Sequence, residues 1–156
     1  ALRDSVKGDR DAVEAMALGQ YVAGMGFSNV GLGLVHGMAH PLGAFYDTPH
    51  GVANAILLPH IMRYNADFTG DKFCDIARAM GVKVEGLSLA DARNAAVDAV
   101  FRLNHDVGIP LHLREAGVQK EDIPMLAQAA YDDVCTAGNP REASLADISE
   151  LYHTAW

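Results

Sequence analysis

Residues 31–51 read Gly31-Leu-Gly-Leu-Val-His36-Gly-Met-Ala-His40-Pro-Leu-Gly-Ala-Phe-Tyr-Asp-Thr-Pro-His50-Gly51, an apolar, glycine-rich segment without lysine or arginine. It contains three histidines, and an imidazole costs free energy to bury unless it has a partner. Imidazole is also the commonest protein ligand for divalent transition metals. The segment therefore predicts a site at which the three rings face a ligand. The alternative is that they are core histidines whose nitrogens bond to backbone carbonyls.

The spacing of the three histidines predicts a helix, a short loop and a second helix. His36 and His40 are four residues apart and would share one face of a helix. Pro41 disfavours helical geometry at the residue before it and lacks an N–H, so we expect this helix to end near Pro41. Pro49 places His50 in the first turn of the next helix. From there His50 can turn back toward the other two rings.

The composition suits a single domain with a sizeable core. The chain has 156 residues, and half of them are hydrophobic. The net charge is −8, the pI is about 5.2, and lysine and arginine form no run. These values argue against binding to nucleic acid or to an anionic membrane surface.

The cysteines and the longest apolar stretch indicate where the protein works. Cys74 and Cys135 are too few and too far apart for a disulfide framework or a cysteine-rich zinc site, so we expect a reducing, cytoplasmic compartment. We expect no signal peptide. Residues 21–39 approach transmembrane length, but polar residues and glycines interrupt them. We interpret this stretch as a core helix, or two short ones.

Helical periodicity along the rest of the chain predicts an all-α, multi-helix domain over residues 1–156. Capping residues mark helix starts at Asp9, Ser88 and Ser144, the last two with an aspartate three residues on as in a capping box. The predicted helices span about 10–25, 51–65, 73–80, 89–108, 122–135 and 145–156. Pro59 should kink or break the second of them. We find no two-residue alternation, hairpin turn or internal repeat.

Several familiar catalytic motifs are incomplete or absent. Gly31-x-Gly begins like a dinucleotide-binding fingerprint, but His36 stands where the third glycine belongs, and no strand precedes it. His36 and His40 have the spacing of a zinc-protease helix without its glutamate. No Gly-x-Ser-x-Gly elbow occurs. We interpret the pair Asp132-Asp133 as part of a solvated helix face. The histidines interpreted as structural or surface residues are His60, His105, His112 and His153.

The segment from His36 to Asn54 resembles the second signature of the group III, iron-dependent alcohol dehydrogenases. The similarity continues through residues 58–65 (Leu-Pro-His-Ile-Met-Arg-Tyr-Asn), 135–141 (Cys-Thr-Ala-Gly-Asn-Pro-Arg) and 151–156 (Leu-Tyr-His-Thr-Ala-Trp). It therefore covers essentially the whole chain. One departure is Asp47, where the family pattern has asparagine. It adds a negative charge near the histidines.

The resemblance implies an enzyme with a Rossmann-like domain that binds NAD(H) and a helical domain that holds one Fe²⁺, for which Zn²⁺ or Ni²⁺ could substitute. It implies that His36 and His50 ligate the metal, together with an aspartate and a histidine from an upstream part that these residues do not contain. His40 would lie near the reacting atoms as a proton relay. The residues that would face the substrate are Phe27, Leu32 and Cys135.

We therefore expect the chain to be the C-terminal part of an NAD-linked oxidoreductase that interconverts small alcohols or vicinal diols with aldehydes by metal-assisted hydride transfer. No residue is assigned to NAD(H) binding. Without the nucleotide-binding domain of its own parent chain, residues 1–156 should be inactive and should self-associate through apolar surface, as a homo-oligomer. Two other functions stay open. One is a zinc hydrolase with His36, His40 and His50 around an open water position, and the other is a helical assembly module without chemistry.

Overall fold

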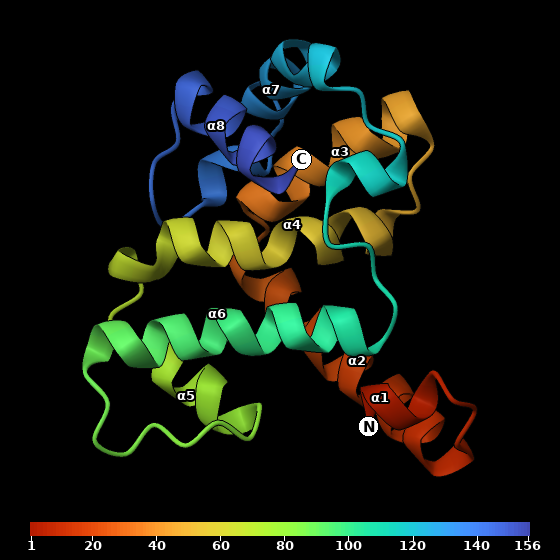
Figure 1. The fold of residues 1–156 in the computed structure, drawn as a ribbon, viewed down its shortest axis with the longest axis vertical. Coiled ribbons are helices and arrows are strands. Elements are labelled where there is room, and N and C mark those ends of the chain that lie inside the picture. Colours follow the sequence, from red (N-terminus) through yellow and green to blue (C-terminus); the bar gives the residue numbers. More distant parts are fainter.

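The structure is a computed structural model that describes residues 1–156, and it contains eight α-helices and no β-strand (Figure 1). The prediction of an all-α fold is confirmed. The α-helices are α1 (Leu2–Ser5), α2 (Arg10–Val30), α3 (Leu34–Tyr46), α4 (His50–Asn65), α5 (Lys72–Ala79), α6 (Leu89–Asp106), α7 (Ile123–Tyr131) and α8 (Leu145–Ala155). Four short 3-10 helices lie between them: η1 (Ala66–Phe68), η2 (Leu113–Ala116), η3 (Lys120–Asp122) and η4 (Thr136–Gly138).

The larger hydrophobic core lies among α3, α4, α7 and α8 and holds 19 buried residues (Figure 1). On α3 the fully buried side chains of Leu34, Met38 and Leu42 recur at helical spacing. The buried Tyr152 of α8 donates its hydroxyl hydrogen to the carbonyl of Met38 at 2.6 Å. This bond satisfies the phenol in the core, and burial raises the pKa of Tyr152. One face of α3 is thus packed in the core, and the face that carries His36 and His40 is only partly buried.

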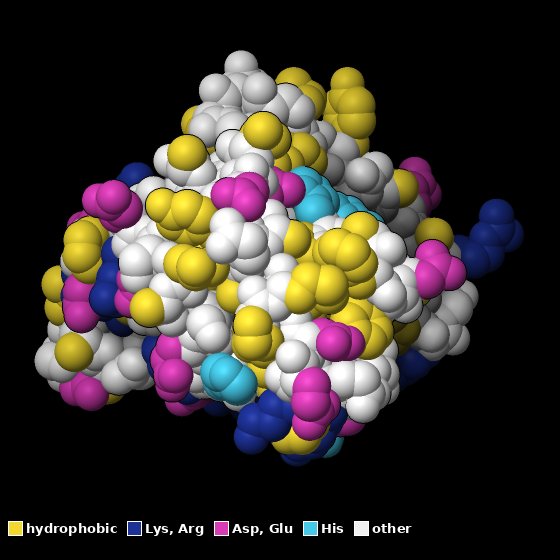
Figure 2. Space-filling model, turned by 90° about the horizontal axis from the view of Figure 1, so that it is seen from above, with side chains coloured by type: hydrophobic (Ala, Val, Ile, Leu, Met, Phe, Trp, Pro, Cys, Tyr) yellow, Lys and Arg dark blue, Asp and Glu magenta, His cyan; other side chains and the backbone are white.

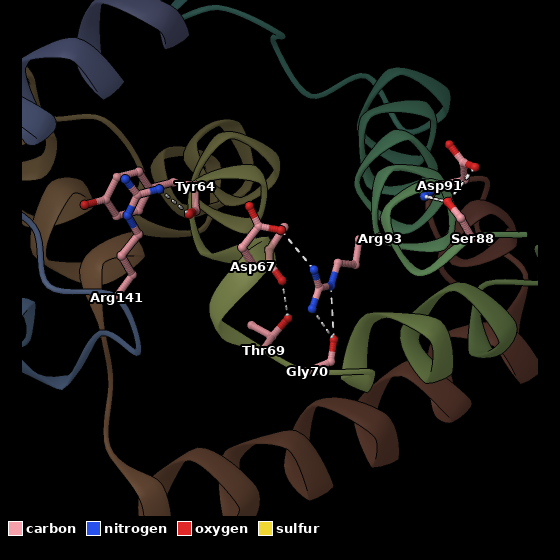
Figure 3. A network of polar contacts seen from close by, with 9 residues as sticks. Tyr64, Asp67, Thr69, Gly70, Ser88, Asp91, Arg93 and Arg141 are labelled. Carbon is pink, nitrogen blue, oxygen red and sulfur yellow. Dashed lines mark hydrogen bonds and ion pairs between the residues drawn. The ribbon is translucent and has the colours of Figure 1, made fainter.

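A smaller core of six buried residues joins α5 to α6, and α4 packs between α6 and the larger core. Arg93 on α6 secures the turn before α5, as Figure 3 shows. Its guanidinium donates to the carbonyl of Gly70 at 2.8 and 3.0 Å and to the carboxylate of Asp67 at 2.9 Å. The Arg93 side chain is only 12% exposed. The Asp67 side chain is 87% exposed, so the ion pair itself contributes little and the hydrogen bonds to the carbonyl of Gly70 hold the turn.

α3 does not end at Pro41, contrary to the prediction from the sequence. The helix runs on to Tyr46. Proline in a helix interior costs about 3 kcal/mol, chiefly through one lost hydrogen bond and a clash with the preceding turn. Leu42 is fully buried directly after it, and burial of a leucine contributes about 1.5–3 kcal/mol. Core packing therefore overrides the proline, and the helix ends only where Asp47 adopts a left-handed conformation (φ 53°).

Of the other predicted helix boundaries, some are correct and some are wrong. α4 begins at His50 after Pro49, as predicted, but it continues through Pro59, so the break does not occur. α7 ends at Tyr131 and does not reach Cys135, which lies in the following turn. Its predicted end was therefore wrong.

The predicted caps are present. The Asp9 side chain accepts a hydrogen bond from the N–H of Ala12, and Ser88 caps α6 in the same way (Figure 3). At α8, Ser144 and Asp147 form a complete capping box. Each cap satisfies backbone N–H groups that the helix cannot pair internally.

α2 is longer than predicted and lies outside the core. Its only buried residue is Ala12, and its main contacts are with α1. Tyr21 and Val30 are 63% and 85% exposed. The interpretation of residues 21–39 as core is therefore wrong for the part in α2, although it holds for α3. No helix of the structure combines the length and the hydropathy that crossing a membrane requires.

His60 is buried on α4 with both ring nitrogens unpaired. Its ring packs edge-on against Phe101 with centroids 5.1 Å apart. Burial lowers the pKa of His60 from 6.5 to about 4, and the charges of Arg63 and His112 act in the same direction. The sequence interpretation of His60 as structural agrees with this position.

We expect His60 to make the fold acid-sensitive between pH 6.5 and pH 4. In this window the unfolded chain binds the proton and the folded chain does not, so the free energy of unfolding falls as the pH falls. The loss is absent above pH 6.5 and reaches about 3 kcal/mol near pH 4. His60→Leu should lower the midpoint of acid unfolding measured by circular dichroism, and the exposed His153→Leu should not. Equal midpoints for the wild type and His60→Leu would contradict this account.

Candidate active site

The start of α4 lies against α3 and brings three histidine rings together. The ring centroids of His36 and His50 are 5.3 Å apart, those of His40 and His50 are 5.6 Å apart, and those of His36 and His40 are 6.1 Å apart. The loop between the helices turns His50 back toward α3, as the spacing predicts. Figure 2 shows histidine side chains grouped at the surface beside acidic and hydrophobic ones.

None of the three rings bonds to a backbone carbonyl, as core histidines commonly do. Nδ1 of His40 lies 2.8 Å from Oδ2 of Asp133, and Nε2 of His50 lies 3.0 Å from Nδ2 of Asn54. His36 makes no hydrogen bond. The Oδ1 atom of Asn54 is buried and has no partner. Polar atoms are thus left available beside the rings, which suits a binding site better than a core.

Asp133 is the site residue that the sequence interpretation missed. Its side chain is 16% exposed and accepts hydrogen bonds from His40 and from the N–H of Cys135, each at 2.8 Å. Burial opposes ionisation, but these hydrogen bonds outweigh it and lower the pKa of Asp133. The solvated-face interpretation is therefore wrong for Asp133. Asp132 is exposed, as predicted, but it follows the last residue of α7 and does not lie on a helix face.

The pKa shifts of His36 and Cys135, which lie near Asp133, favour the neutral forms of both side chains. Burial lowers the pKa of His36, and the nearby His50 and His40 lower it further, while Asp133 acts against them. Neutral imidazole is the form that binds metal ions. Burial and the Asp133 carboxylate raise the pKa of Cys135, which favours the thiol. Both cysteines of the chain are unpaired.

Among the three pairs, the rings of His36 and His50 come nearest to the centroid separation of two imidazoles on one metal ion, and the His40–His50 separation of 5.6 Å is close to it as well. Two imidazoles that bind one ion at about 2.0–2.1 Å in tetrahedral geometry hold their centroids about 5 Å apart, and the observed distance is 5.3 Å. A three-histidine site would need one nitrogen of each ring within about 4 Å of the others. The one group of three potential ligands whose atoms lie within 4.8 Å of one another is His40, Asp133 and Cys135. The three-histidine zinc site of a hydrolase is therefore not formed.

An open groove of about 330 Å³ lies between α3 and α4 beside the histidines. Leu32, His36, Asn54 and Leu58 are among the residues that line it. Apolar walls with a few polar groups suit a small, partly polar molecule. Of the residues predicted to face the substrate, Leu32 lines this groove and Cys135 lies beside Asp133. The third, Phe27, is on α2, is 48% exposed and does not line the groove.

Two glycines allow the turn that follows α7 to lie directly against α3. A Cβ atom at Gly37 would overlap the hydroxyl oxygen of Thr136, and one at Gly138 would overlap the carbonyl oxygen of Leu32. Thr136 also donates its hydroxyl hydrogen to the carbonyl of Ala130 at 2.6 Å. The absence of side chains at these two positions thus sets the distance between the histidine helix and the turn that holds Asp133.

The other end of this turn is fastened to the end of α4. Asn139 and Asn65 exchange amide hydrogen bonds of 2.8 and 2.9 Å. Arg141 donates to the carbonyl of Tyr64 at 3.0 Å, and its guanidinium lies 3.8 Å from the centroid of the Tyr64 ring, as Figure 3 shows. Asp133 and Cys135 therefore belong to a segment with both ends held.

Comparison with known proteins identifies the family. Residues 1–156 match the sequence model described as Fe-containing alcohol dehydrogenase family, C-terminal. The chain belongs to this family. It is 83% identical to lactaldehyde reductase of Escherichia coli (strain K12), over 100% of this chain and 41% of the reductase. It is 48% identical to 1,3-propanediol dehydrogenase of Citrobacter freundii, over 93% of this chain and 38% of that enzyme.

A solved structure of the family supports the fold. The iron-containing alcohol dehydrogenase from Thermococcus thioreducens superposes with a TM-score of 0.81 at 32% identity, over 98% of this chain and 39% of that chain. The family resemblance noted in the sequence is confirmed. The chain spans about two fifths of the length of the curated relatives described above.

Proposed function

We propose that this chain forms the metal- and substrate-binding part of an NAD-linked oxidoreductase that interconverts lactaldehyde and 1,2-propanediol. The observation that carries the proposal is the pairing of His36 and His50 at 5.3 Å, with His40 beside both. The 83% identity to lactaldehyde reductase supports the substrate. The relation to 1,3-propanediol dehydrogenase supports the wider class of small diols and hydroxyaldehydes.

His36 and His50 would hold the metal, and His40 would exchange a proton with the substrate oxygen. When bound, Fe²⁺ supplies a Lewis acid for that oxygen and NAD(H) supplies or accepts the hydride, and Zn²⁺ or Ni²⁺ suits the same imidazole ligands. Leu32 would limit the size of the substrate within the groove, and Cys135, which does not line the groove, would do so from beside Asp133. Phe27 lies outside the groove, so it would contact the substrate only where the substrate extends beyond the groove.

We further propose that the chain acts within a longer polypeptide. It spans about two fifths of its relatives, and its all-helical structure has no strand–turn–helix to bind the phosphates of NAD(H). The exposed apolar side chains of α2 need cover from the rest of that polypeptide or from a second copy. We therefore propose that the isolated chain is inactive and that the enzyme is a homo-oligomer. The unpaired cysteines suit a reducing compartment such as the cytoplasm.

The test is the turnover of NADH by the intact, Fe²⁺-loaded protein with a series of aldehydes. We expect kcat/KM to be highest for lactaldehyde, to fall by at least about 100-fold after the metal is chelated, and to return when Fe²⁺ is added. The same assay on residues 1–156 alone should match the buffer blank. Failure of the intact holoprotein to oxidise NADH with any small aldehyde, or full activity after chelation, would overturn the proposal.

A further inference from the structure

The carboxylate of Asp133 is held in place before any substrate binds. Oδ1 accepts the N–H of Cys135, and Oδ2 lies 2.8 Å from Nδ1 of His40. The side chain is 16% exposed, so water competes little for either oxygen. The turn that carries it is fixed against α3 and α4 at both ends. Asp133 is therefore a rigid acceptor aimed at one nitrogen of His40.

This contact decides which nitrogen of His40 carries the proton. An ionised carboxylate can only accept hydrogen bonds, so Nδ1 of His40 must be the donor. The neutral ring then has its lone pair on Nε2. Nε2 has no hydrogen-bond partner in the structure, and the side chain is 39% exposed. His40 is thus held in a single tautomer with a free basic nitrogen.

We propose that Asp133 is a positioning residue that holds His40 in the tautomer and orientation required for proton exchange with the substrate. The inference rests on the proposed function. For aldehyde reduction His40 must first be protonated on Nε2 as well, and this Nε2–H would give its proton to the carbonyl oxygen as the C=O π bond breaks, while NADH, when bound, would supply the hydride for the new C–H bond. The ring then regains a proton from water. In alcohol oxidation each transfer runs in reverse.

A metal site on the same three residues is the competing explanation. His40, Asp133 and Cys135 offer ligand atoms within 4.8 Å of one another. Nδ1 of His40 and Oδ2 of Asp133 already bond to each other, however, and a metal held between these two atoms would replace that bond. The positioning role needs no such change. The two explanations differ in whether loss of Asp133 changes the metal content.

The decisive experiment is a double-mutant cycle in the intact, metal-loaded enzyme with Asp133→Asn, His40→Ala and the double variant. Asparagine keeps the size of the side chain but can also donate, so it no longer imposes the Nδ1–H tautomer. We expect Asp133→Asn to lower kcat for lactaldehyde about 100-fold, with little change in KM and unchanged metal content. The double variant should be no slower than His40→Ala, because Asp133 acts only through His40.

Asp132→Asn is the matched control. Asp132 is the neighbouring carboxylate, is exposed and pairs with Gln128, so its replacement should leave kcat unchanged. Additive losses in the double variant, loss of metal from Asp133→Asn, or a wild-type kcat for Asp133→Asn would overturn the inference.

Nuclear magnetic resonance of ¹⁵N-histidine in the Zn²⁺-loaded enzyme tests the tautomer without turnover. We expect Nδ1 of His40 to be protonated in the wild type and Asp133→Asn to give a mixture of tautomers. An unchanged His40 spectrum in Asp133→Asn would overturn the positioning role whatever the substrate is. Absence of lactaldehyde reduction by the wild type would instead refute the proposed function, and the spectrum would still decide the role of Asp133.

Discussion

Replacement of His50 by alanine should remove the metal from the intact enzyme, whereas replacement of His40 should leave it bound. His36→Ala should behave like His50→Ala, because both rings are proposed ligands of the same ion, and their centroid separation of 5.3 Å is compatible with that role. His40 differs because its proposed role is proton exchange and not metal ligation, and the proposed ligands are His36 and His50. Loss of groups that merely support a ligand weakens metal binding about 10–100-fold, and loss of a ligand itself should cost more.

Elemental analysis after dialysis against a chelator measures this difference directly. We expect little metal in His36→Ala and His50→Ala, and a full complement in His40→Ala with kcat lowered about 100-fold. His105→Ala is the control, since His105 lies on the surface with its side chain 76% exposed. Full metal retention by His50→Ala would show that the ligands are assigned wrongly.

The parts of the fold that depend on local chemistry could be predicted from the sequence. The caps at Asp9 and Ser144 form because the donor and acceptor lie within one helical turn. The ends of α3 and α7 could not be predicted in the same way. Pro41 argues locally for a helix end, but Leu42 is anchored in a core built from the next helix, α4, and from α7 and α8, which are distant in sequence. Tertiary packing decided that boundary.

The same distinction applies to the site. His36, His40 and His50 lie within one short segment, so the helical spacing of the first two and the short loop before His50 bring them together. The contact between His40 and Asp133 spans 93 positions of the sequence, and no local pattern distinguishes Asp133 from Asp132. α2 shows the opposite problem, because its apolar pattern predicts burial while the structure of these residues provides no partner for it.

Gly138→Ala should damage both the stability and the active site of the intact enzyme. The added Cβ would overlap the backbone oxygen of Leu32, so the turn must move away from the start of α3. Forcing an extra methyl group into a packed contact costs about 1–3 kcal/mol. Asp133 and Cys135 belong to the displaced segment, so kcat should fall as well. Urea unfolding and NADH turnover measure the two effects.

Gly37→Ala offers a test of the same contact from the side of α3, with an internal control. Its Cβ would overlap the hydroxyl of Thr136, whereas a Cβ at Gly43 on the same helix would have only an ordinary contact at 3.7 Å. Gly43→Ala should therefore be neutral or stabilise the helix by about 0.5–1 kcal/mol, while Gly37→Ala destabilises it. Thr136→Ala should recover part of the loss in Gly37→Ala, because it removes the overlapping atom. Thr136→Ala should recover nothing in Gly138→Ala, where the overlap is with the backbone of Leu32. Equal stabilities of Gly37→Ala and Gly43→Ala would disprove the close approach of Gly37 to Thr136.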